Sequence, residues 1–274
     1  MKKITLTCAH AIVKYLIAQK ILINGKKEPL FPGVFGIFGH GNVACLGQAL
    51  EESQNELPTY RGHHEQNMAL TGIAYSRAKR RKQIFIATSS VGPGSTNMVT
   101  AAAVAMSNRI PILFLPGDTF SNRFPDPVLQ QVEHFNNPGI TVNDAFKSVT
   151  RYFDRITRPE QIISSLQQAI QVMLDPADCG PACISLSQDV QGEVYDYPEV
   201  FFKERVHTIR RSKPDDFQIK EAAELIKKSK KPIIISGGGV FYSDAMEELS
   251  KFAIKHNIPV TQTVMGYSTM KRDH

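Results

Sequence analysis

The sequence of 274 residues has no tryptophan, only four cysteines and no long uninterrupted run of apolar residues. Apolar runs such as Ile233–Ile235 are far shorter than the ~20 residues that a membrane-spanning helix needs. No continuous apolar stretch follows the basic residues at the start of the chain, so a signal peptide is also disfavoured. Hydrophobic residues make up 42% and charged residues 21%, which is ordinary for a globular protein and argues against long disorder.

The small number of cysteines limits both disulfide and metal chemistry. Cys8, Cys45, Cys179 and Cys183 do not form a disulfide framework, so a reducing cytoplasm is the expected location. Cys179 and Cys183 are close enough in the chain to suggest a metal site, but no second close pair accompanies them. A structural zinc site is therefore disfavoured, and we expect no metal to be held by this chain's own residues.

The excess of positive over negative charge is small. The net charge of +6 permits anionic ligands but is too small and too dispersed to indicate nucleic-acid binding. The tightest basic cluster, residues 79–82, falls where a predicted helix ends, and cations there complement the helix dipole. We therefore expect neither a nucleic acid nor a membrane as a partner.

Helix-like and strand-like segments alternate along most of the chain. The patterns predict helices over residues 7–20, 42–52, 63–79, 97–106 and 159–174, and strands over residues 33–38, 57–60, 83–88, 111–115 and 181–186. This order is typical of an α/β fold with a doubly wound parallel sheet. Ligands bind such sheets beyond the carboxyl ends of the strands, so segments 39–42, 89–95 and 117–137 are the first candidates for function.

The same patterns divide the chain into two predicted domains. Residues 1–195 form the first, and residues 196–213, which lose periodicity and gain charge, are predicted to be a linker. Residues 214–274 begin a second, Rossmann-like α/β domain with two predicted helices and two predicted strands. So few elements seldom form a stable core alone. Either they pack on the first domain, or the chain is a fragment of a larger protein; the fragment is the favoured interpretation.

Two glycine-rich turns follow predicted strands. Gly237–Gly239 lacks the dinucleotide-binding register, because Tyr242 occupies the position of the last glycine, and a tight structural turn is favoured there. The turn Gly92–Asn97 is not a Walker loop, because no Gly-Lys-Ser/Thr follows it. Its backbone N–H groups could hold a polar ligand, or the segment could be a structural turn only.

Glu65 opens a predicted helix directly after two histidines, His63 and His64. Adjacent residues on a helix point in different directions, so this pair makes a poor metal site. On its pattern alone Glu65 is an exposed acid in a first helical turn, where the helix dipole favours its ionised form. The apolar residues that follow leave open a second reading, a partly buried carboxyl group that exchanges protons near neutral pH.

Five segments together match the pattern of a known enzyme family in order and spacing. They are Gly36–Gly41, His64–Ala69, Ala74–Ala78, Ala87–Asn97 and Ile110–Leu113. Their sequences resemble the pyrimidine-binding domain of thiamine-diphosphate enzymes of the acetolactate synthase type. The resemblance covers essentially the whole chain, with the pyrimidine-binding domain reaching about residue 195 and the first part of the family's central domain following it.

The resemblance implies roles for individual residues. Glu65 falls at the position of the family's activating glutamate, whose carboxyl group hydrogen-bonds the aminopyrimidine ring of the cofactor. Gln130 matches a glutamine that orients the substrate, although it could equally make only a loop hydrogen bond. His40 lies in the loop that faces the thiazolium ring and could transfer a proton to the product. The backbone expected to approach the cofactor or the facing subunit belongs to Gly92, Pro93 and Gly94.

The resemblance also implies what other parts of the enzyme supply. In this family a later domain, marked by Gly-Asp-Gly, holds the diphosphate through a divalent metal, Mg²⁺, and the cofactor lies between two subunits. No Gly-Asp-Gly occurs in this sequence. The chain is therefore expected to contribute half of a thiamine diphosphate site, to be inactive alone, and to work within a homodimer or homotetramer.

A second set of segments indicates one branch of the family, hydrolases that open the ring of a cyclic dione in myo-inositol catabolism. These segments are residues 38–43, 88–94, 115–120, 125–131 and 189–193. Two alternatives stay open. One is a carboligase or decarboxylase that resembles acetolactate synthase and acts on 2-oxo acids, and the other is a non-catalytic module that serves only oligomerisation.

Overall fold

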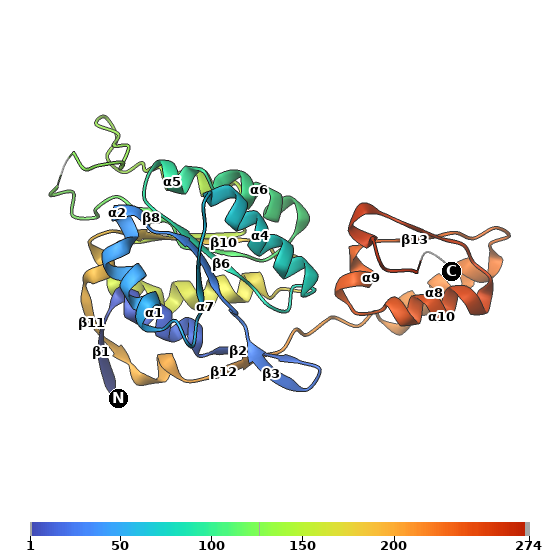
Figure 1. Cartoon of the computed structure of the whole chain (residues 1–274). Helices are drawn as coiled ribbons and strands as arrows, with labels where there is room; N and C mark the ends of the chain where they lie inside the picture. Colours follow the sequence, from blue (N-terminus) through green and yellow to red (C-terminus); the bar gives the residue numbers. More distant parts are fainter. Residues whose placement is uncertain (1, 126, 272–274) are drawn as a thin grey trace. The chain divides into compact units, whose positions relative to one another are not determined.

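Figure 1 shows the computed structural model of the chain, which describes residues 2–125 and 127–271. The chain divides into two compact units, residues 1–209 and residues 210–274. Asp126, which belongs to one of the segments that carry the family resemblance, lies outside the described residues, as do residue 1 and residues 272–274 at the ends of the predicted domains.

A seven-stranded sheet forms the centre of the first unit. Its strands are β4 (Val34–Ile37), β5 (Thr59–Arg61), β6 (Ile86–Ser89), β7 (Leu113–Phe114), β8 (Gly117–Asp118), β9 (Tyr152–Ile156) and β10 (Ala182–Ser187). They lie in the order β5-β4-β6-β7-β10-β8, and β9 also pairs with β10. Every pairing is parallel. The predicted α/β fold with a parallel sheet is confirmed, and the turns after the strands share one edge.

Helices cover both faces of this sheet (Figure 1). One face packs against α1 (Cys8–Ile17), α3 (Gln48–Glu52) and α7 (Ile162–Met173), and the other against α4 (Glu65–Ala78) and α6 (Val99–Asn108). Neighbouring strand residues alternate between the two cores: Leu113 joins the first and Phe114 the second. This alternation is the period of two that a strand buried on both faces requires.

Local chemistry begins two of these helices at defined residues. The Thr7 hydroxyl accepts a hydrogen bond from the His10 amide at 3.3 Å and caps α1. The His64 ring accepts one from the Asn67 amide at 3.3 Å and caps α4. The first residue of α4 is therefore Glu65, one of the residues singled out from the sequence.

Two segments near the N-terminus differ from the sequence expectation. The predicted helix 7–20 is shorter, because β1 (Lys3–Thr7) precedes it and a hairpin of β2 (Gln19–Ile23) and β3 (Lys26–Pro29) follows it. Asn24 and Gly25 both have positive φ, as a tight hairpin turn demands. The predicted turn at residues 39–42 is instead α2 (Gly39–Asn42), which continues through the π-helical η1 (Val43–Gly47) into α3.

Short helical turns complete the first unit. They are α5 (Pro93–Thr96), η2 (Val142–Ser148), η3 (Pro159–Gln161), η4 (Val190–Gly192) and η5 (Glu199–Phe202). Of these, α5, η2 and η4 belong to the carboxyl edge of the sheet or contact it. Pro93 is the first residue of α5, where its missing N–H leaves no hydrogen bond unmade.

The first unit extends beyond the boundary expected at residue 195. β11 (Val194–Pro198) pairs antiparallel with β1, and β12 (Arg205–His207) pairs parallel with β2. Tyr197 and Phe201 are buried in the first core. Most of the expected linker 196–213 therefore belongs to the first unit, and its irregular pattern reflects short strands with one exposed side.

The second unit consists of α8 (Asp216–Lys228), β13 (Ile234–Ser236), α9 (Gly238–Tyr242), α10 (Met246–His256), β14 (Val260–Gln262) and η6 (Val264–Gly266), with β13 and β14 parallel. The Asp215 carboxylate accepts a hydrogen bond from the Gln218 amide at 2.8 Å and caps α8. Gly237 connects β13 to α9, which begins with Gly238 and Gly239. Many large apolar side chains are exposed, including Phe217, Leu225 and Ile235, so this unit has only a small core of its own.

Candidate active site

Hydrogen bonds tie together the turns at the carboxyl edge of the sheet. The Asn42 amide donates to the Thr88 hydroxyl at 2.9 Å and to the Ser89 carbonyl at 2.8 Å. The Gln191 amide, beyond β10, donates to the Asn42 side-chain oxygen at 2.9 Å. All four side chains are buried, so these bonds are shielded from water and fix the turns after β4, β6 and β10 to one another.

The Glu65 carboxylate lies at this edge, half-buried and oriented by a single amide. The Asn97 side chain donates a hydrogen bond to Glu65 Oε2 at 2.7 Å. A Cβ built on Gly94 would lie 3.5 Å from Glu65 Oε1. One carboxylate oxygen is thus held, and the other faces backbone that carries no side chain. Such a group can present one oxygen to a ligand in a fixed orientation.

Gly92 makes the turn from β6 into α5 possible. Its φ of +70° lies in the region that side chains disfavour, and a Cβ at this position would lie 1.7 Å from the Gln130 carbonyl oxygen. Only glycine permits the loop around residue 130 to approach the turn this closely.

We expect Gly92→Ala to lower the free energy of unfolding by about 2 kcal/mol or more, because the strain of a positive φ adds to the clash with a backbone atom. Urea unfolding of the 274-residue chain measures the change. Gly25→Ala is the matched control: Gly25 also has a positive φ, +78°, but a Cβ there meets no atom within 4 Å. If the two variants lose the same stability, the clash with Gln130 contributes nothing.

Neither Gln130 nor His40 is hydrogen-bonded to the Glu65 carboxylate within the described residues. The Gln130 side chain is exposed in the long segment that loops away from the sheet between β8 and η2 (Figure 1), and only its carbonyl meets Gly92. Within the part of the chain that the structure describes, the buried Nε2 of His40 has no hydrogen-bond partner, while the His40 carbonyl accepts from the Gln188 amide at 3.1 Å. Among residues 2–125 and 127–271, neither side chain hydrogen-bonds Glu65.

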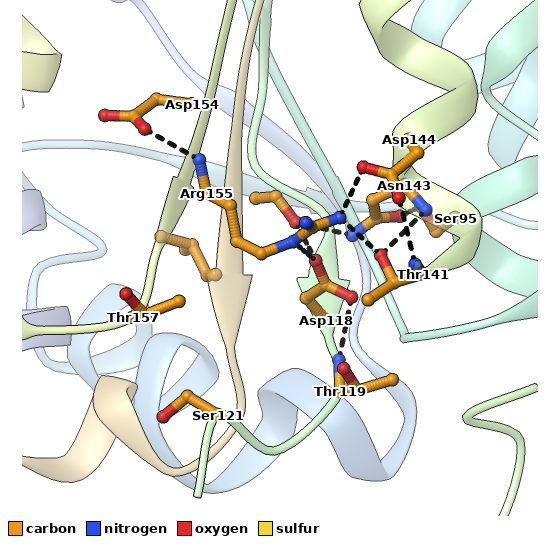
Figure 2. A network of polar contacts seen from close by, with 12 residues as sticks. Ser95, Asp118, Thr119, Ser121, Thr141, Asn143, Asp144, Asp154, Arg155 and Thr157 are labelled. Carbon is orange, nitrogen blue, oxygen red and sulfur yellow. Dashed lines mark hydrogen bonds and ion pairs between the residues drawn. The ribbon is translucent and has the colours of Figure 1, made fainter. Parts of the chain in front are cut away.

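A buried polar network connects α5 to the sheet (Figure 2). The Ser95 hydroxyl donates to the Asn143 side-chain oxygen. The Asn143 amide in turn donates to the Gly117 carbonyl at 2.9 Å and to the Ser185 hydroxyl at 2.7 Å. Asn143 therefore connects α5, which carries Gly94 and leads into Asn97, to strands β8 and β10 of the sheet.

An ion-pair cluster continues this network. The Arg155 guanidinium donates to Asp118 Oδ2 at 2.8 Å and to Asp144 Oδ1 at 2.7 Å (Figure 2). Asp118 is 1% exposed, so removal of Arg155 would leave a buried carboxylate without a counter-ion. Burial acts to raise the pKa of Asp144, but hydrogen bonds from Lys147, the Thr141 amide and Arg155 outweigh it and hold that pKa below its usual value.

Sequence reasoning assigned no role to Asn97, Ser90 or Asn143. Asn97 and Ser90 lie in the segment Ala87–Asn97, which carries part of the family resemblance. The motif places these residues in the chain but does not show which atoms they contact. Asn143 lies in η2, a segment with no predicted element, and 48 residues separate it from Ser95. No local pattern indicates such a contact.

Two further features of the described residues concern metal binding and membrane insertion. Within residues 2–125 and 127–271, no three His, Cys, Asp or Glu side chains are grouped so that they could hold a metal ion. None of the described helices combines the length and apolar character needed to cross a bilayer.

Family comparisons agree with this architecture. The model of the N-terminal TPP binding domain of thiamine pyrophosphate enzymes matches residues 30–137, and the model of the central domain of the same enzymes matches residues 219–274. The chain therefore belongs to the thiamine pyrophosphate enzymes. Glu65, Gly92 and Asn97 all fall within the segment matched by the N-terminal domain.

Several relatives of the chain have the name 3D-(3,5/4)-trihydroxycyclohexane-1,2-dione hydrolase. The chain is 54% identical over 271 residues to the protein from Clostridium tetani. The aligned region covers 99% of this chain and 42% of the relative. The chain is 51% identical over 274 residues to the protein from Geobacillus thermodenitrificans and 52% identical over 272 residues to that from Bacillus subtilis, each covering 43% of the relative. The chain thus spans less than half the length of these curated relatives.

Proposed function

We propose that this chain is the N-terminal part of a thiamine-diphosphate-dependent hydrolase. Its substrate would be 3D-(3,5/4)-trihydroxycyclohexane-1,2-dione, whose ring opens at a C–C bond to give 5-deoxyglucuronate in myo-inositol catabolism. The identity of more than half of the residues to a relative with this name, over 99% of the chain, supports the substrate. The orientation of Glu65 by Asn97 beside Gly94 is the structural observation that carries the proposal.

The residues around Glu65 fit the aminopyrimidine ring of thiamine diphosphate. Oε2 is held by Asn97, while Oε1 faces the backbone of Gly94, which has no side chain of its own to obstruct a flat ring. When bound, the cofactor supplies the electron sink that C–C cleavage requires. Glu65 would hold a proton at Oε1 and share it with a ring nitrogen, and Asn97 would keep the carboxyl group turned toward that nitrogen.

Other residues at the edge would act on the substrate or shape the cofactor pocket. Gly92, Pro93 and Gly94 would present backbone to the cofactor or to the facing subunit. We assign to Gln130 the orientation of the substrate, which requires its side chain to turn inward from its exposed position. The His40 ring, whose Nε2 is buried without a partner, would pass a proton to the ring-opened product.

The diphosphate and Mg²⁺ would be held outside these residues. We infer that another domain of a partner subunit binds them, so that the working enzyme is at least a homodimer and each site is shared between two subunits. All four cysteines are free, which fits a reducing compartment such as the cytoplasm.

The test is an assay of the complete protein with thiamine diphosphate and Mg²⁺. We expect cofactor-dependent opening of the cyclic dione and no acetolactate from pyruvate. Formation of acetolactate without dione turnover would favour the carboligase alternative, and no turnover of either substrate would favour a non-catalytic module. Calorimetric titration of the 274-residue chain with thiamine diphosphate and Mg²⁺ is expected to show no tight binding, because the chain supplies only the pyrimidine side. Tight binding would contradict the shared site.

A further inference from the structure

Three buried polar atoms at the carboxyl edge have no hydrogen-bond partner among the described residues. They are Ser90 Oγ, His40 Nε2 and Gln188 Oε1. A buried polar group without a partner destabilises the fold by about 1–3 kcal/mol. Such a group at the same edge as a candidate site therefore indicates that a ligand supplies the missing hydrogen bond. Each of these side chains follows a different strand, namely β6, β4 and β10.

Ser90 lies between two glycines of this edge. A Cβ built on Gly39 would lie 2.4 Å from Ser90 Oγ, and a Cβ built on Gly94 would lie 3.4 Å from Ser90 Cβ. The same position on Gly94 is 3.5 Å from Glu65 Oε1. Ser90 and the Glu65 carboxylate therefore both lie against the open side of Gly94. Ser90 is only 6% exposed, and its amide donates to the Ile37 carbonyl at 2.9 Å, so its position is fixed.

Gln188 and His40 adjoin Ser90 through the short helix α2, whose first residue, Gly39, packs against Ser90. The Gln188 amide nitrogen donates to the His40 carbonyl at 3.1 Å, which leaves its side-chain oxygen as an acceptor. Gln191 holds the next part of α2, by donating to the Gly41 carbonyl at 3.3 Å and to Asn42. A helix fixed in this way is organised before any ligand arrives, so little binding energy is lost in ordering it.

We propose that Ser90, His40 and Gln188 recognise the hydroxyl groups of a polyhydroxylated ring, and that Ser90 determines the specificity of this recognition. This inference rests on the proposed function and adds to it the residues that read the substrate. A serine hydroxyl and an imidazole nitrogen can each donate or accept, and an amide oxygen accepts. A ring hydroxyl does both, so it can pair with any of the three. An acyclic 2-oxo acid without hydroxyl groups leaves them buried and unpaired, which a site of this kind rejects strongly.

Ser90→Ala in the complete, cofactor-loaded protein tests the proposal. We expect the KM for the dione to rise about tenfold and kcat to change little, because the lost hydrogen bond is made in both the ground state and the transition state. The melting temperature of the ligand-free variant should not fall, because the removed hydroxyl has no partner among the residues that the structure describes. An unchanged KM overturns the proposal, and so does a KM rise accompanied by a large loss of melting temperature.

Ser76→Ala is the matched control. The Ser76 hydroxyl is also buried without a hydrogen-bond partner in residues 2–125 and 127–271, but it lies near the end of α4, far along the helix from Glu65. Its removal should leave the KM unchanged. If the wild-type protein does not open the dione, the proposed function fails, and the inference is then tested by titrating wild type and Ser90→Ala with myo-inositol. Weaker binding by the variant supports the inference, whereas equal binding, or no binding by either, overturns it.

Discussion

Replacing Glu65 by glutamine should lower kcat for the dione by about 100-fold to 10,000-fold in the complete enzyme. The amide has the shape of the carboxyl group and still offers an oxygen to the Asn97 side chain, so the local structure should persist. It cannot exchange a proton with a ring nitrogen, which is the step assigned to Glu65 Oε1. The measurement is turnover at saturating thiamine diphosphate and Mg²⁺, with circular dichroism and gel filtration to show that fold and assembly are unchanged.

The control for this variant is Glu56→Gln, which removes an exposed carboxylate of the same first unit. Its turnover should equal that of the wild type. If Glu65→Gln kept more than half of the wild-type turnover, the carboxyl group would have no part in the chemistry, and the non-catalytic alternative would gain support. A variant that lost its fold would leave kcat undefined, so the same comparison is repeated with Glu65→Asp, which keeps the acid but retracts it from its position.

Replacing Arg155 by methionine should lower the free energy of unfolding by about 3–5 kcal/mol. The change leaves Asp118, which is 1% exposed, buried without the cation that pairs with it at 2.8 Å. The ion pair between Arg155 and Asp144, at 2.7 Å, is lost at the same time. Urea unfolding of the 274-residue chain near pH 7 measures the effect.

Arg158→Met is the control for this second change. The Arg158 side chain is 73% exposed and pairs with Glu160 on the surface, where an ion pair contributes about 1 kcal/mol or less. A loss in Arg155→Met no larger than in this control would contradict the buried-charge account. Adding Asp118→Asn to Arg155→Met removes the unpaired charge, so the double variant should recover part of the lost stability.

Local periodicity was enough to predict the centre of the fold. The strands at Val34–Ile37 and Ile86–Ser89 and the helix at Glu65–Ala78 all carry apolar residues at the spacing their burial demands. The N-terminal strand at Lys3–Thr7 was not predicted, although Ile4 and Leu6 alternate with polar residues, because five residues of such alternation do not by themselves mark a strand. Its partner, Val194–Pro198, lies at the other end of the unit, and neither segment alone indicates this pairing.

The candidate site divides in the same way. The family resemblance named Glu65 and the Gly92–Gly94 turn because both belong to contiguous motifs. It offered no view of the contact between Asn143 and Ser95, or of that between Arg155 and Asp118, which are 48 and 37 residues apart. For Gln130 the motif gave a position in the chain but not the orientation of the side chain, which depends on the backbone of a long loop.

The pairing of the first strands with the last ones sets the order in which the unit can form on the ribosome. Thr5 meets Asp196 and Gln19 meets His207, separations of 191 and 188 residues. At about 5–20 residues per second, these partners are synthesised roughly 10–40 s after the strands that need them. Throughout that delay β1 and β2 expose unpaired edges, which are open to pairing with other chains. The N-terminal strands are therefore where a nascent chain most needs protection by a chaperone.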